Sequence, residues 1–100
     1  MIKINIKGQN IIDELLITGH ANYDDSGKDI VCASVSSILI TTVNAIIRID
    51  NNSIDYKEDD GVCVTILKHT KTIDILLDNL VALLQELKKQ YPKYIEIRRC

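Results

Sequence analysis

The sequence predicts an α+β fold in which a small mixed or antiparallel sheet packs against two helices, with the element order ββαββαβ. Several short segments alternate apolar and polar residues, which is the period of half-buried strands. Two segments of about twenty residues are instead helical by length or by the spacing of their apolar residues. The chain has 100 residues, of which 46% are hydrophobic, with no Phe and no Trp. We therefore expect residues 1–100 to form a single domain with a core of Ile, Leu and Val.

The first two elements form a predicted hairpin. Residues 2–7 alternate Ile with Lys or Asn, as a half-buried strand does. Gly8-Gln9-Asn10 is turn chemistry, and residues 11–18 are again apolar and strand-like. Together these segments predict two antiparallel strands that end at Gly19-His20.

A polar loop over residues 21–28 leads to the first helix, with Asp29 at the N-cap position and helical residues from Ile30 to about Ile49. The apolar residues of this helix cover more than one of its faces: Val31, Val35, Ile38, Leu39, Ile40, Val43, Ile46 and Ile47. A helix that is apolar nearly all round must be buried nearly all round, and one sheet face cannot do that. The pattern therefore predicts a homodimer with this helix near the interface. The alternative is that the second helix covers it within one chain.

The second half of the chain supplies the remaining elements. Residues 54–57 and 62–67 flank an Asp60-Gly61 hairpin signal. Residues 71–90 form an amphipathic helix with leucines at three- and four-residue spacing. Residues 94–98 alternate as a final strand, which completes the predicted order.

The charge and the cysteine usage exclude several function classes. The net charge is −2 and the pI is about 5.6, so no basic patch supports direct nucleic-acid binding. The three cysteines form no CxxC pair, so we expect no metal, no cofactor and free thiols in a reducing compartment. The first residues alternate too strictly for a signal peptide, and residues 31–49 carry too many polar side chains for a good membrane helix. These observations predict a cytoplasmic protein with no membrane partner.

The chemistry-bearing residues are His20 and Cys32, twelve positions apart with the polar loop between them. Cys32 falls in the first helical turn, where free N–H groups and the helix dipole favour the nucleophilic thiolate and could stabilise an oxyanion. His20 could lower the thiol pKa further and then protonate a leaving amine. Asp29 could cap the helix through the N–H of Val31 or Cys32, or orient His20 as the third member of a triad. Its negative charge works against the thiolate.

His20 and Cys32 could also have purely structural roles. A cysteine near a helix start is usually a small apolar filler. A histidine at a strand end is usually a surface residue. Spacing alone therefore leaves catalysis and packing open.

Three runs of residues resemble the ribosomal-processing cysteine protease family, Prp: Gly19-His20-Ala21; Asp29-Ile30-Val31-Cys32-Ala33 with Ser36; and Val43-Asn44-Ala45-Ile46. The resemblance implies a homodimeric α+β cysteine protease. Such an enzyme removes the N-terminal extension of large-subunit ribosomal protein twenty-seven, cutting after an aromatic residue. By motif position, Cys32 is the nucleophile, His20 the general base and Asp29 a helper. Gly19 and Ser36 belong to the motif and are assigned to the substrate-binding region, with helix packing as the alternative for Ser36.

The polar loop itself is expected to contact substrate. Tyr23 could contact an aromatic substrate side chain, and Gly27 could act as a hinge as the loop orders on substrate binding. Asp24 and Asp25 could attract a basic ribosomal tail, or could belong to a solvated loop. Two other classes stay open: a non-catalytic ribosome-associated binding protein acting in ribosome assembly, and another cysteine hydrolase or acyl-transfer enzyme. A binding protein has no need of a reactive cysteine beside a histidine, so the thiol discriminates between them.

Overall fold

The computed structural model describes residues 1–24 and 29–100 and places seven elements in the predicted order ββαββαβ. The strands are β1 (Ile2–Lys7), β2 (Glu14–Thr18), β3 (Ile54–Glu58), β4 (Gly61–Ile66) and β5 (Ile95–Arg99). The helices are α1 (Ile30–Ile49) and α2 (Lys71–Gln90). The α+β fold is confirmed, and both helices begin and end where the sequence predicts.

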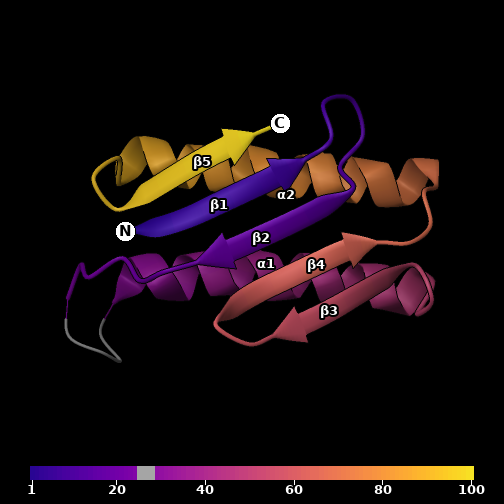
Figure 1. Cartoon of the computed structure of the whole chain (residues 1–100), viewed down its shortest axis with the longest axis horizontal. Coiled ribbons are helices and arrows are strands. Elements are labelled where there is room, and N and C mark those ends of the chain that lie inside the picture. The colour runs from indigo at the N-terminus through magenta and orange to yellow at the C-terminus, as the bar shows by residue number, and fades with distance from the viewer. Residues whose placement is uncertain (25–28) are drawn as a thin grey trace.

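The five strands form one mixed sheet in the order β3-β4-β2-β1-β5 (Figure 1). Every neighbouring pair is antiparallel except β1 and β5, which run parallel. The β1–β2 hairpin therefore occupies the middle of the sheet, with Lys3 opposite Thr18. This pairing fixes the point at which the chain leaves β2, immediately before Gly19-His20.

The second strand is shorter than predicted, because β2 begins only at Glu14. The N–H of Asp13 donates to the carbonyl of Lys7 (2.8 Å) and closes a wide loop between the two strands. Within this loop Ile12 is buried, whereas Ile11 is 46% exposed. The two isoleucines look alike in the sequence, and apolar character alone does not separate a strand from a loop that buries one side chain.

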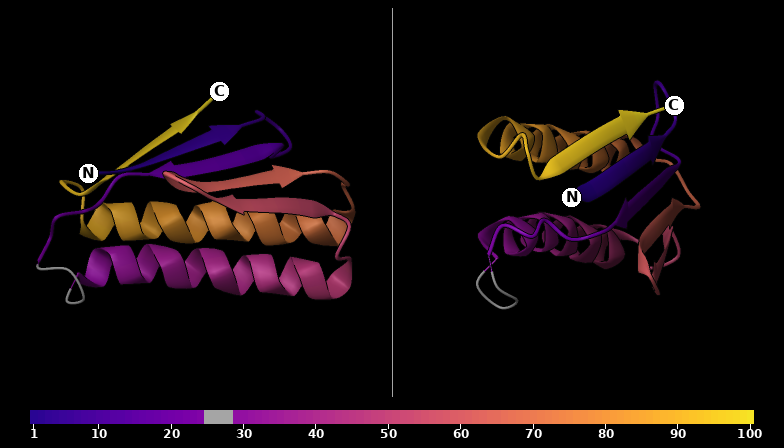
Figure 2. Two further views of the ribbon diagram at one scale, coloured as in Figure 1. Left: turned by 60° about the horizontal axis from the view of Figure 1, so that its bottom comes forward. Right: turned by 60° about the vertical axis from the view of Figure 1, so that its left-hand side comes forward.

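Both helices lie on the same face of the sheet, side by side (Figure 2). Helix α1 contributes buried Val35, Leu39 and Ile46 to the common core. Part of the apolar stripe on α1 stays uncovered in one chain, since Ile40 is 39% exposed and Ile47 is 38% exposed. Coverage by α2 therefore accounts for only part of the stripe, and the homodimer stays a prediction.

Helix α1 is more apolar than its polar side chains suggest: by length and composition alone it could cross a membrane. Core helices of soluble proteins share these properties. Here a third of the apolar window is buried inside the chain.

Candidate active site

The first turn of α1 is organised by Asp29, which caps the helix as predicted. Its Oδ1 accepts hydrogen bonds from the N–H groups of Val31 and Cys32, each at 3.0 Å. The cap therefore uses both of the N–H groups that the sequence offered as alternatives. Its Oδ2 accepts the N–H of Tyr23 at 3.2 Å. These N–H groups, with that of Cys32 foremost, hold the pKa of the Asp29 carboxyl below its usual value. The cap places Cys32 in the first turn and ties the polar loop to it.

Strand β2 ends at Thr18, and the turn that follows it favours glycine at position 19. Gly19 has φ +83°, a left-handed conformation that L side chains rarely adopt. A Cβ at this position would also overlap the carbonyl oxygen of Met1. The N-terminal end of β1 therefore lies against Gly19, and His20 is the residue that follows this contact.

A backbone N–H lies beside the sulfur of Cys32: that of Ala21 is 3.3 Å from Sγ. Burial raises the pKa of the Cys32 thiol, the Ala21 N–H lowers it, and Asp29 raises it further. The net direction is upward, so the resting group is the thiol. The expected shift toward thiolate is absent, first because burial disfavours the charged sulfur and then because the Asp29 carboxylate lies beside it.

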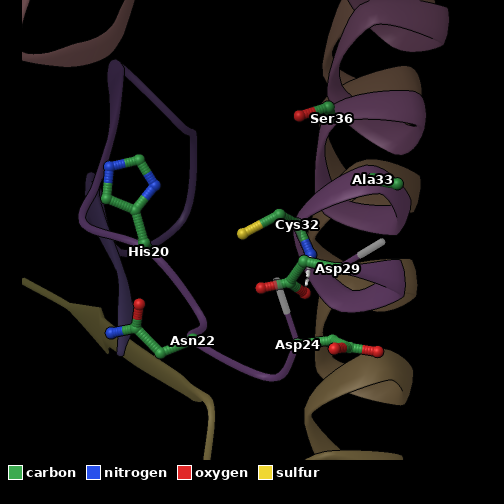
Figure 3. Close-up of a pocket in the computed structure, with 7 residues that line it drawn as sticks. All are labelled: His20, Asn22, Asp24, Asp29, Cys32, Ala33 and Ser36. Carbon is green, nitrogen blue, oxygen red and sulfur yellow. Dashed lines mark hydrogen bonds between the residues drawn. The ribbon is translucent and has the colours of Figure 1, made fainter. Parts of the chain in front are cut away.

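His20 and Cys32 line one pocket of about 510 Å³ (Figure 3). Its lining consists of His20, Asn22, Asp24, Asp29, Cys32, Ala33 and Ser36. The Cys32 sulfur projects from α1 toward the segment that carries His20, and the imidazole lies across the pocket from it. Within the described part of the chain, no hydrogen bond joins His20 to Cys32 or to Asp29. The imidazole is exposed, so rotation about its side-chain bonds has room to occur.

The residues expected to contact substrate are spread over three places. Ser36 lines the pocket one turn beyond Cys32. Gly19 lines a neighbouring pocket that also reaches His20. The ring of Tyr23 packs edge-to-face on Tyr91 and Tyr94, with centroids 5.5 and 5.1 Å apart, and is 41% exposed. Asp25 and Gly27 lie outside the described residues.

Sequence reasoning missed two features of this pocket. Asn22 adopts a left-handed backbone with φ +55° and lines the pocket two residues after His20. Asn is among the few residues that tolerate this conformation, so its place in the loop was an available signal. The approach of the Ala21 N–H to sulfur left no signal, because it depends on how α1 docks beside β2.

The other cysteines lie elsewhere. The Cys63 thiol is half-buried on β4 and donates to Glu14 (3.3 Å), and burial raises its pKa. Cys100 is exposed. Among residues 1–24 and 29–100, no three His, Cys, Asp or Glu side chains gather into a metal-binding group.

Comparisons with known proteins agree with this geometry. The family model described as "Cysteine protease Prp" matches residues 1–96. The ribosomal processing cysteine proteases Prp of Mycoplasma pneumoniae and Staphylococcus aureus are 32% and 26% identical. These alignments cover 95% and 96% of this chain, and 91% and 94% of those proteins. A crystal structure of the essential ribosomal processing protease Prp from S. aureus, with a covalently linked product peptide, superposes with a TM-score of 0.93 at 25% identity, over the whole of both chains.

Proposed function

The chain belongs to the Prp family of cysteine proteases, and we propose that it removes the N-terminal extension of large-subunit ribosomal protein twenty-seven. In this proposal residues 1–100 act as a single protease domain, with Cys32 as nucleophile and His20 as general base. The observation that carries it is that both side chains line one pocket and that the Cys32 sulfur projects into it toward His20. The relatives named as ribosomal processing proteases support a ribosomal substrate.

Catalysis begins with the transfer of the Cys32 thiol proton to His20. The imidazole must first turn toward Sγ, because the two groups do not touch at rest. The sulfur electron pair then forms a bond to the carbonyl carbon, and the carbonyl π electrons move to oxygen. When the C=O bond reforms, the C–N bond breaks and the His20 imidazolium protonates the leaving amine. A thioester of the N-terminal fragment on Cys32 remains.

The thioester is then hydrolysed by water. His20 takes one proton from the water while its oxygen bonds to the acyl carbon, and the C–S bond breaks as the second tetrahedral intermediate collapses. The sulfur regains a proton from His20. The two steps release the extension as a carboxylic acid and the mature protein as an amine, with no cofactor required.

Asp29 serves this reaction as a positioning residue. Its oxygens bind the backbone of Val31, Cys32 and Tyr23, so the carboxylate fixes both sides of the pocket. It has no bond to His20 within the described residues, and the orienting role therefore has less support than the capping role. Ser36, Gly19 and Tyr23 complete the proposed substrate-binding region, with Ser36 on the pocket wall.

The partner surface proposed for dimerisation is the uncovered side of α1. Ile40 and Ile47 lie seven residues apart, so they fall on one line along the helix. Both are more than a third exposed. A second copy of the chain would remove this apolar line from water. We place the enzyme in the cytoplasm, where ribosomal proteins are made.

The experiment that tests this function uses the extended ribosomal protein as substrate, with mass spectrometry of the products. The wild-type chain should make one cut that removes the extension, and Cys32→Ala should make none. Cys63→Ala is the matched control and should cleave normally, because Cys63 lies on β4 outside the pocket. Co-elution of the two intact proteins without any cut would favour a non-catalytic assembly factor. Hydrolysis of other acyl substrates alone would favour a different cysteine hydrolase.

A further inference from the structure

A cysteine protease needs donors aimed at the oxyanion that forms during attack, and the start of α1 does not offer them freely. The N–H groups of Val31 and Cys32 already donate to Asp29 Oδ1. The N–H of Ala33 donates to the Asp29 carbonyl at 3.1 Å. An oxyanion at the Val31 and Cys32 N–H groups would have to displace the anionic Asp29 carboxylate, which the N–H of Tyr23 also holds in place.

We propose that the backbone N–H of Ala21, on the loop after β2, is an oxyanion donor of this enzyme. This inference rests on the proposed function, since it assigns a further catalytic group to the same reaction. The N–H already points at the reacting sulfur, 3.3 Å away. It comes from the residue that directly follows the general base, so one short segment supplies both groups.

The distance fits the chemistry. In the tetrahedral intermediate the oxyanion is bonded to the carbon that is bonded to Sγ, so oxygen lies two bonds from the sulfur. An N–H group beside Sγ is therefore within reach of the separation of ~2.7–3.1 Å that oxyanion donors require. In the resting enzyme the same N–H lowers the pKa of the thiol. Its hydrogen bond passes from sulfur to oxygen as negative charge moves onto oxygen.

The Ala21 peptide is held in place before substrate arrives. Its methyl group is buried, at 3% exposure, which anchors the residue in the core. On one side Gly19 makes its left-handed turn against Met1. On the other side Asn22, also left-handed, returns the chain so that the N–H of Tyr23 binds Asp29. A donor fixed from both sides needs no reorganisation during the reaction, which is what makes such a donor effective.

The direct test replaces the His20–Ala21 amide by an ester, which removes this N–H and keeps every side chain. The full chain can be assembled by ligating a synthetic segment 1–31 to a segment that begins at Cys32, with an all-amide chain assembled in parallel. The ester chain should lose about 10²–10³-fold in kcat with little change in KM. Its thiol pKa should rise, since the N–H lowers it at present.

Equal kcat in the ester and all-amide chains would overturn the inference while leaving the proposed function intact. An all-amide chain that is folded and cleaves no substrate would instead overturn the proposed function, and the inference with it.

Two encoded variants of Asn22 give a second test that does not depend on refolding a synthetic chain. Asn22→Gly accepts the left-handed backbone and should lose much less kcat, and raise the thiol pKa much less, than a residue that resists this backbone. Asn22→Val resists that backbone, so it should displace the Ala21 peptide, lower kcat and raise the thiol pKa. Loss of kcat in Asn22→Gly as large as in Asn22→Val would point to the Asn22 side chain instead and refute the assignment. Wild-type kcat and thiol pKa in Asn22→Val would refute it as well.

Discussion

The turn at Gly19 links the stability of this chain to its activity, and Gly19→Ala perturbs it with one methyl group. The residue has φ +83°, and the added Cβ would overlap the carbonyl oxygen of Met1. Placing alanine in a left-handed conformation costs about 1–2 kcal/mol before any overlap is counted. For a chain of this size that cost lowers the Tm by roughly 5–15 °C.

The overlap cannot be relieved without moving backbone, because both atoms belong to paired strands or their ends. We expect the turn to shift away from β1 and to carry His20 with it. A displacement of about 1 Å at a catalytic group costs about 100-fold in rate. Gly19→Ala should therefore lose about two orders of magnitude in kcat at temperatures where the chain is still folded.

Gly8→Ala is the matched control. Gly8 has φ +109°, and a Cβ there would overlap the carbonyl oxygen of Ile11, at the opposite end of the β1–β2 hairpin (Figure 1). It should destabilise the chain at least as much as Gly19→Ala yet leave kcat near wild type. Thermal unfolding and cleavage kinetics on both variants decide the matter. A wild-type kcat in Gly19→Ala, or an equal loss of kcat in Gly8→Ala, would show that the turn at Gly19 does not position His20.

Three further predictions follow from other parts of the molecule. Cys32→Ala should abolish cleavage with no loss of far-ultraviolet circular dichroism; residual turnover would move the nucleophile elsewhere. Ile47→Glu should give a monomer by sedimentation, whereas Ile75→Glu on exposed α2 surface should not; a dimer in both would discard the α1 interface. Hydrogen bonding to Asp74 raises the pKa of His69, so its stabilisation is present below about pH 6.5 and is lost as pH rises through the folded-state value. His69→Gln should thus lower the Tm more at pH 6 than at pH 9, and an equal loss at both pH values would contradict that sign.

The sequence predicted the elements well where one local rule dominates. The alternation in β1, the Asp29 cap and the leucine spacing of α2 are each decided by nearby residues, and each is confirmed. The predicted start of β2 was wrong because Ile11 and Ile12 are equally apolar in the sequence but differ in burial. The difference arises in the loop before β2, where the Asp13 carbonyl accepts the N–H of Ile66 (2.9 Å), a contact between segments far apart in the chain.

The site shows the same limit. His20 and Cys32 could be singled out from their spacing, and the structure brings them to one pocket. The direction of the Cys32 pKa shift could not be predicted from the sequence, because it depends on burial and on the Asp29 oxygens. The packing of Tyr23 on Tyr91 and Tyr94 joins segments far apart in the chain, so no local sequence pattern predicts it.

The proposed function requires that Cys32 carries the acyl group during cleavage. To test this, the enzyme is quenched during turnover of the extended ribosomal protein, its intact mass is measured and any adduct is mapped by digestion. We predict an adduct on the peptide that contains Cys32, with the mass of the released extension less one water, and none with Cys32→Ala. Cleavage that proceeds without a thioester, or with the adduct on Cys63 or Cys100, would show that Cys32 is not the nucleophile.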